Sequence, residues 1–159
     1  KYSKKLSKKK RNELREYIQN IAVDYSIDYA DIDEIEEKNI LHATISAMHR
    51  AISKLKNPPD NLLVDGNQFK LYKDKDGMII PHQTVKGGDN KFRNIAAASI
   101  LAKVYHDDYV IDLLDKNPEL EKYGWRNNMC YGTKQHMDAI KMYGTSKYHR
   151  KSFGICKDY

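Results

Sequence analysis

Two aspartates are the residues whose types and spacing could support chemistry. Asp65 follows the apolar run Leu62-Leu63-Val64, and Asp89 follows Gly87-Gly88. Each stands where a strand is expected to end, and neighbouring strands can bring such ends to one edge of a sheet. Hard divalent cations take oxygen ligands, and two such ions can hydrolyse a phosphodiester by activating water and stabilising the leaving oxygen. Both sequences are also common turns, so that alternative stays open for each aspartate taken alone.

The elements that would position these aspartates follow from the apolar pattern. We expect short strands over residues 62–64 and 79–85, separated by a charged, glycine-containing turn over residues 70–77. A long helix is expected from residue 94 toward 114, and its alanine-rich start would let it pack closely on a sheet. The pattern over residues 62–114 thus predicts a sheet covered by a helix.

Before the two aspartates, the spacing of apolar residues changes from the period of a helix to the period of two that is typical of a strand. Ser7 is placed to cap a helix that extends to residue 21. Alternation over residues 21–30 then predicts a strand with one polar face, which carries Asp24 and Asp28.

Two further helices complete the expected α/β unit. One is expected to start at Asp31 or Asp33 and to end before Pro58-Pro59. The last is expected over residues 133–143 and should end at Gly144. At 159 residues the chain is expected to form a single domain with its own core.

Charge and cysteine content narrow the possible partners and compartment. The formal charge is +6, and seven of the first eleven residues are basic: Lys1, Lys4, Lys5, Lys8, Lys9, Lys10 and Arg11. A polyanionic partner fits this charge, although a solvated helix start fits it equally well. Cys130 and Cys156 form no metal or disulfide motif, and no apolar run approaches membrane length. We expect a cytoplasmic monomer that does not bind membranes.

Several motifs in order make the sequence resemble the ribonuclease HII (type 2 ribonuclease H) family over essentially its whole length. Any one of these motifs would be weak evidence by itself, but their order makes chance an implausible explanation. The matching stretches are Ser3-Lys4-Lys5-Leu6-Ser7, Asn39-Ile40-Leu41-His42-Ala43-Thr44, Val64-Asp65-Gly66-Asn67, Val85-Lys86-Gly87-Gly88-Asp89, the run from Ile95 to Val104, Tyr131-Gly132-Thr133 with His136, and His149-Arg150 with Ser152-Phe153.

The resemblance implies a ribonuclease H-like fold, with a mixed sheet between helices and a helical C-terminal part. It also implies an active site of four carboxylates, two of which match Asp65 and Asp89. The other two form an adjacent Asp-Glu pair followed by Gly-Arg-Gly in the family, and no such sequence occurs here. Asp33-Glu34 is the only adjacent Asp-Glu and is interpreted as a helix start, where acids favour the dipole. Because the chain opens at Lys1 within a basic motif, we expect it to be N-terminally incomplete and to lack the first active-site strand.

Substrate-contacting residues are also implied by the resemblance. Tyr131 matches a tyrosine that senses the 2′-hydroxyl of a ribonucleotide, the group that distinguishes RNA from DNA, although a half-buried core tyrosine is the alternative. Before it the family has Lys-Gly, whereas this chain has Met129-Cys130. The remaining candidates would hold phosphates or brace the site, with ordinary surface positions as the alternative for each: Lys4, Lys5, Asn67, Lys86, Lys103, His149 and Arg150.

The expected activity is hydrolysis of the RNA strand of RNA–DNA hybrids, and of ribonucleotides embedded in DNA, with two Mg²⁺ or Mn²⁺ ions and a 3′-hydroxyl product. No organic cofactor is expected. The alternative is a catalytically inactive module that binds hybrids or serves as a structural subunit, because the Asp-Glu strand is absent.

Overall fold

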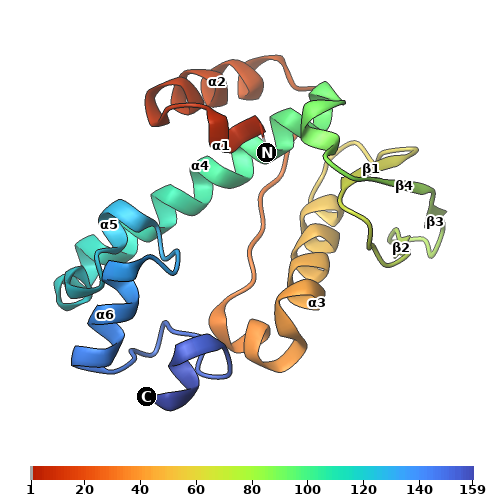
Figure 1. Ribbon diagram of the computed structural model, residues 1–159. Coiled ribbons are helices and arrows are strands. Elements are labelled where there is room, and N and C mark those ends of the chain that lie inside the picture. The colour runs from red at the N-terminus through yellow and green to blue at the C-terminus, as the bar shows by residue number, and fades with distance from the viewer. Residues whose placement is uncertain (1) are drawn as a thin grey trace. The chain divides into compact units, whose positions relative to one another are not determined.

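The computed structural model describes residues 2–159, with only the backbone described at Tyr2 and Lys4. It divides into two units: the first holds the residues up to Tyr29 together with Thr44–Tyr105, and the second holds Ala30–Ala43 and His106–Tyr159. Figure 1 labels the helices and strands, and η marks 3₁₀ helices below. The elements are α1 (Tyr2–Lys5), α2 (Lys8–Ile21), α3 (Ile32–Ser53), β1 (Leu62–Asp65), β2 (Tyr72–Lys73), β3 (Ile79–Ile80), β4 (His82–Val85), η1 (Gly88–Asn90), α4 (Arg93–Lys116), η2 (Pro118–Tyr123), α5 (Trp125–Asn128), α6 (Lys134–Tyr143) and η3 (Gly154–Asp158).

The strands of the first unit form two small sheets. β1 pairs in parallel with β4, and the register sets Asp65 opposite Val85. Between them the chain makes an antiparallel hairpin from β2 and β3, which lies next to the start of β4 in Figure 1. Two expectations need correction: the charged stretch over residues 70–77 contains strand β2, and the expected strand over 79–85 is broken at Pro81. Proline has no N–H to continue a ladder, and the Pro81 carbonyl instead accepts the N–H of Leu62 at 2.8 Å.

Three helices begin at or next to the residues where the sequence predicts a helix start. The Ser7 hydroxyl accepts the N–H of Lys10 at 3.2 Å at the start of α2. The Asp31 carboxylate accepts the N–H of Glu34 at 2.8 Å before α3. Thr133 caps α6, which ends at Gly144 as expected. Each cap satisfies a backbone donor that the first helical turn leaves without a partner.

Helix α3 is interrupted at Asn39, which the expectation of one continuous helix missed. Asn39 has φ 62° and ψ 164°, outside the helical region. Its side-chain oxygen accepts the N–H groups of Leu41 at 3.0 Å and His42 at 3.2 Å. Asn39 therefore ends one helical segment and caps the next, a role for which asparagine is well suited.

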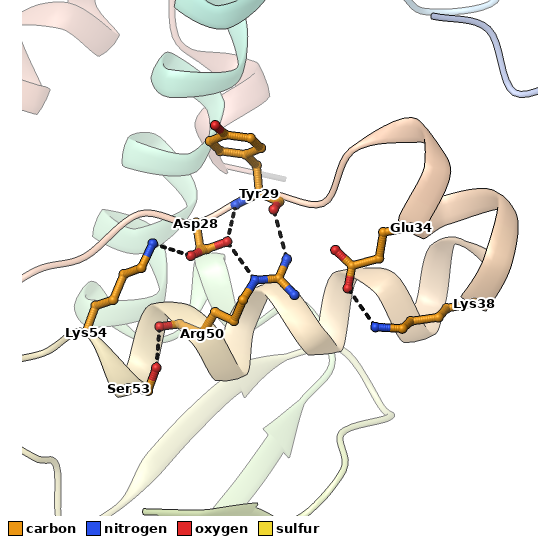
Figure 2. A network of polar contacts seen from close by, with 7 residues as sticks. All are labelled: Asp28, Tyr29, Glu34, Lys38, Arg50, Ser53 and Lys54. Atoms are coloured by element: carbon orange, nitrogen blue, oxygen red, sulfur yellow. Dashed lines mark hydrogen bonds and ion pairs between the residues drawn. The ribbon is translucent and has the colours of Figure 1, made fainter. Parts of the chain in front are cut away.

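The expected strand over residues 21–30 is wrong, although its alternation has a physical basis. The segment is extended, but within residues 2–159 it pairs with no neighbouring strand. Figure 2 shows the Asp28 carboxylate between Arg50, at 2.9 Å, and Lys54 of α3. Four residues earlier, Asp24 accepts the N–H of Lys56 at 2.6 Å. The polar face is thus bound to the end of α3 by side-chain contacts rather than by a ladder.

Each unit has its own apolar core. In the first, Ile18 of α2 packs with residues of α4, and Ile27 of the extended segment lies against the same cluster, which contains Ile100, Leu101 and Val104. In the second, Tyr123 and Trp125 are almost fully buried, together with Val110, Leu114, Leu120, Ala139 and Ile140. The first core fixes the helix that follows Asp89, and Met129, at the start of the loop that carries Tyr131, packs against the second core.

Candidate functional site

Asp65 stands at the last position of β1, where the backbone turns sharply. Gly66 has φ 127°, a conformation that side-chain-bearing residues rarely adopt. Its N–H donates to the carbonyl of Val85 at 3.0 Å, so the end of β1 is held against the end of β4. The two strands therefore finish together, and the residues that follow them share one corner of the first unit.

The Asp65 carboxylate is fixed by the segment that contains Asp89. Its Oδ1 accepts the backbone N–H of Gly88 at 2.9 Å. Gly87 before it is left-handed, with φ 65°, and a Cβ on Gly88 would lie 2.6 Å from Ile95 Cδ1. A larger residue at this position would require the end of the Ile95 side chain to move. Asp65 and Asp89, brought to this place by β1 and η1, form what we call the acidic corner.

Asp89 is buried rather than displayed on a surface turn. It is 2% exposed, and the Asn90 side-chain amide donates to Asp89 Oδ1 at 3.1 Å. Buried carboxylates are uncommon unless they are paired, hydrogen-bonded or bound to a metal. The alternative interpretation of Gly87-Gly88-Asp89 was a turn exposed to solvent. The burial of Asp89 argues against that interpretation.

Basic residues border the acidic corner from two directions. Helix α1 lies against η1, and the Arg11 guanidinium donates to the carbonyls of Ser3, at 3.3 Å, and Leu6, at 2.6 Å, which holds α1 to α2. Lys5 on α1 is exposed, and so is Lys86, which follows β4 directly.

The other candidates of the first unit differ in exposure. Asn67 is exposed in the turn after Gly66, and Lys103 is half-buried on α4. The side chain of Lys4, another predicted phosphate contact, lies outside the described residues. Asp24 and Asp28 do not join the corner, since both carboxylates bind groups at the end of α3.

In the second unit, Tyr131 follows two residues in the left-handed conformation. Met129 has φ 49° and Cys130 has φ 64°. The Tyr131 N–H donates to the carbonyl of Asn128 at 3.0 Å, and its side chain is 48% exposed. Cys130 therefore adopts the backbone shape that glycine favours, at the position where the family has glycine. Tyr131 is a half-exposed residue on a tightly turned loop and not part of the buried core.

His149 and Arg150 lie in different surroundings, and the expectation that His149 holds phosphate must be corrected. His149 is 4% exposed, its Nδ1 accepts the N–H of Ser146 at 2.9 Å, and its Nε2 faces Nε2 of His136 at 3.1 Å. Both ring nitrogens therefore face protein groups. Arg150 stacks over the Phe153 ring, 4.3 Å from the guanidinium carbon to the ring centroid. No role for His136 follows from the sequence, although its position three residues after the Thr133 cap places it inside the first turn of α6.

Comparison with known proteins identifies the family of this chain. A family model described as ribonuclease HII matches residues 1–156. The chain belongs to the ribonuclease HII family. Among its relatives, the ribonuclease HII of Christiangramia forsetii is 46% identical over 156 residues, which cover 98% of this chain and 75% of the relative. That of Parabacteroides distasonis is 48% identical over 153 residues, covering 96% and 73%.

A solved structure agrees with the fold. The crystal structure of the ribonuclease H2 from Pyrococcus horikoshii matches with a TM-score of 0.73 and 20% identity, over 98% of this chain and 77% of that chain. The ribonuclease H-like α/β fold expected from the sequence is therefore confirmed. Ribonuclease HII proteins are endoribonucleases, so the chain belongs to a family of hydrolytic enzymes. Among the described residues, no helix is long and apolar enough to cross a membrane.

Ribonuclease HII proteins generally depend on divalent metal ions, and the acidic corner offers suitable donors. Carboxylate oxygens are the ligands that Mg²⁺ and Mn²⁺ prefer. Within residues 2–159 no group of three or more histidine, cysteine, aspartate or glutamate side chains is placed to hold a metal ion. Asp65 and Asp89 thus offer the kind of oxygen donor that a hard divalent ion takes.

Proposed function

We propose that this chain carries part of the catalytic centre of an enzyme that hydrolyses the RNA strand of RNA–DNA hybrids and ribonucleotides embedded in DNA. The observation that carries the proposal is the acidic corner, in which the Asp65 carboxylate is fixed on Gly88, directly before the buried Asp89. The family membership of the chain supports the same reaction.

Asp65 and Asp89 are proposed to hold the divalent ions. Two bound Mg²⁺ or Mn²⁺ ions would supply an activated water and stabilise the leaving oxygen, which yields a 3′-hydroxyl product. The hydrogen bond from Gly88 fixes the rotation of the Asp65 carboxylate, and Asn90 does the same for Asp89. These contacts pre-orient both acids, so that little reorganisation accompanies metal binding.

Lys5 and Lys86 are proposed to bind phosphates of the duplex. Both are exposed and border the acidic corner, so they can hold the backbone without reading base sequence. Lys4, Asn67, Lys103 and Arg150 remain candidates for further contacts with the duplex.

Tyr131 is proposed to contact the 2′-hydroxyl of the ribonucleotide. Its side chain is half-exposed, and its backbone is held by Asn128. In a catalytically active form of the protein, Tyr131→Phe should lower cleavage at a single ribonucleotide in DNA more than cleavage of a long hybrid. Equal losses on both substrates would assign Tyr131 to folding and remove it from the site.

The substitution Asp65→Asn tests the metal site, with Asp60→Asn as its matched control. Asp60 is exposed and precedes the other end of β1, so the same change of charge is made away from the corner. We expect Asp65→Asn to weaken Mn²⁺ binding, measured by calorimetry. In a catalytically active form of the protein it should also lower cleavage by at least roughly 100-fold, since changes to residues that merely support metal ligands already cause losses of 10- to 100-fold. Asp60→Asn should leave both unchanged. Equal behaviour of the two variants would overturn the assignment.

A module that binds hybrids without cutting them is the second candidate function. Residues 1–159 carry two of the four carboxylates that the family resemblance implies, Asp65 and Asp89. We expect the purified 159-residue chain to bind an RNA–DNA hybrid weakly and to show no cleavage with Mg²⁺ or Mn²⁺. Metal-dependent cleavage by this chain that disappears in Asp65→Asn would exclude the binding-only function.

A further inference from the structure

Two buried histidines of the second unit lie in direct contact with each other. His136, in the first turn of α6, is 7% exposed, and His149 is 4% exposed. Their Nε2 atoms are 3.1 Å apart, and the indole Nε1–H of Trp125 donates to His136 Nε2 at 3.0 Å. The Tyr123 ring covers the pair, with its centroid 4.6 Å from that of His149. Neither the acidic corner nor the proposed metal chemistry uses these groups.

The surrounding donors fix which nitrogen of each ring carries a proton. The Ser146 backbone N–H can only donate, so His149 Nδ1 must accept, and the proton of neutral His149 resides on Nε2. That proton points at His136 Nε2, which already accepts from Trp125. His136 must then carry its proton on Nδ1, which lies 3.1 Å from the carbonyl oxygen of Tyr131. The two rings are therefore opposite neutral tautomers.

Both histidines stay neutral around pH 7 because of this environment. Burial lowers the pKa of His149 to about 4, assisted by repulsion from His136. Burial also lowers the pKa of His136. A proton added to His149 Nδ1 would face the Ser146 N–H, a donor opposite a donor, and its acceptor would have to be the Ser146 hydroxyl, 2.9 Å from the same nitrogen.

The hydrogen-bonded chain ends on the loop that presents Tyr131. The Tyr131 carbonyl accepts from His136 and from the N–H of Thr133 at 2.8 Å, while its own N–H is bound to Asn128. The backbone on both sides of the exposed ring is thus fixed, directly after the two left-handed residues. Without the contact from His136, the carbonyl would lose its bond from α6 and keep the short-range bond from Thr133.

We propose that His136 and His149 are positioning residues, which use their opposite tautomers to hold the Tyr131 backbone and so set how well the protein distinguishes a ribonucleotide from a deoxynucleotide. This inference rests on the proposed contact between Tyr131 and the 2′-hydroxyl. Fixing a recognition group in advance favours the correct ligand, because less conformational freedom is lost on binding.

Two substitutions of His136 separate positioning from packing. His136→Asn places an amide N–H near the position of Nδ1 and keeps a donor for the Tyr131 carbonyl. His136→Gln places its amide near Nε2, which keeps an acceptor for Trp125 but removes the donor to Tyr131. Both variants lose the ring, so a purely structural role predicts similar behaviour for the two.

The test is the ratio of dissociation constants for a DNA duplex and for the same duplex with one ribonucleotide, measured by fluorescence anisotropy on the 159-residue chain. We expect His136→Gln to reduce this preference roughly tenfold, the effect of losing one hydrogen bond of ordinary strength, and His136→Asn to retain most of it. In the unchanged chain, ¹⁵N spectra of the imidazoles should show His136 protonated on Nδ1 and His149 on Nε2. Equal ratios for the two variants, or other tautomers, would overturn the proposal.

Tyr131→Phe distinguishes a failure of this inference from a failure of the proposed function. If Tyr131→Phe reduces the preference but His136→Gln does not, Tyr131 contacts the ribonucleotide without help from the histidines, and the inference is wrong. If Tyr131→Phe leaves the preference unchanged, the proposed contact itself is wrong. The imidazole spectra test the tautomers independently of any nucleic acid.

Discussion

The Asp65 carboxylate accepts the backbone N–H of Gly88 at 2.9 Å, which ties the last residue of β1 to the residue directly before Asp89. A side chain and a backbone amide thus connect two motifs that are separate in the sequence. Because a Cβ on Gly88 would press on the end of the Ile95 side chain, the packing at the acidic corner favours a residue as small as glycine.

Gly88→Ala should destabilise the first unit. The added Cβ would lie 2.6 Å from Ile95 Cδ1, and relief of such overpacking typically costs about 1–3 kcal/mol. Gly132→Ala is the matched control, because a Cβ there meets nothing within 4 Å. Urea denaturation should show a lower free energy of unfolding for Gly88→Ala alone. A stability equal to that of Gly132→Ala would mean that Ile95 moves aside without penalty.

Cys130→Gly should stabilise the protein, by about 0.5–1 kcal/mol, since a side-chain-bearing residue at φ 64° is strained and glycine is not. Asn127→Gly, within α5, provides a control of opposite sign, because glycine in a helix is unfavourable by about 1 kcal/mol. Thermal unfolding monitored by circular dichroism measures both. A loss of stability in Cys130→Gly would show that the thiol contributes packing that outweighs the strain.

Stability should fall with acidity between about pH 6.5 and 4 because of the two histidines. Their pKa values are lowered in the folded state, so the unfolded chain binds protons first, below its ordinary value of about 6.5. Stability is therefore complete above pH 6.5 and is lost as the pH falls. Asp28, whose pKa is lowered mainly by its hydrogen bond from Lys54, adds a further loss only below about pH 3.8. Unfolding free energies measured from pH 8 to pH 4.5 should fall less steeply for His149→Gln than for the unchanged chain, and parallel curves would contradict this assignment.

Asp28→Ala should lower the free energy of unfolding by about 1–3 kcal/mol, because the carboxylate is nearly buried between Arg50 and Lys54 and joins the extended segment to α3. Asp138→Ala is the control: it removes an exposed pair with Lys134 within α6 and should cost less than about 0.5 kcal/mol. Equal losses in urea denaturation would show that the Asp28 contacts contribute no more than a surface pair does.

Local signals in the sequence were sufficient for the helix starts and for β1. Ser7, Asp31 and Thr133 cap helices by contacts within a few residues, and such contacts are encoded locally. The structure of residues 21–30, by contrast, depends on contacts with residues that are distant in the sequence. Alternation over residues 21–30 indicated two different faces correctly, but it could not show whether the polar face meets side chains of α3 or a neighbouring strand.

Like the fold, the candidate site could be predicted only in part from the sequence. Asp65 and Asp89 were found from motif order, whereas the bond to Gly88 depends on the strand register. His149 was misassigned because its residue type permits both a surface contact with phosphate and a buried neutral ring, and only its depth in the second core separates the two. His136 lacked a role for the same reason.

The parallel pairing of β1 with β4 across the β2–β3 hairpin also bears on the order of folding. The strand pairings and the hydrogen bond from Gly88 to Asp65 lie within residues 62–90, so they close short loops of chain. Short loops lose little entropy on closure and form quickly. We therefore expect this segment to acquire its shape early, before more distant contacts such as that between Gln19 and Tyr105 are made.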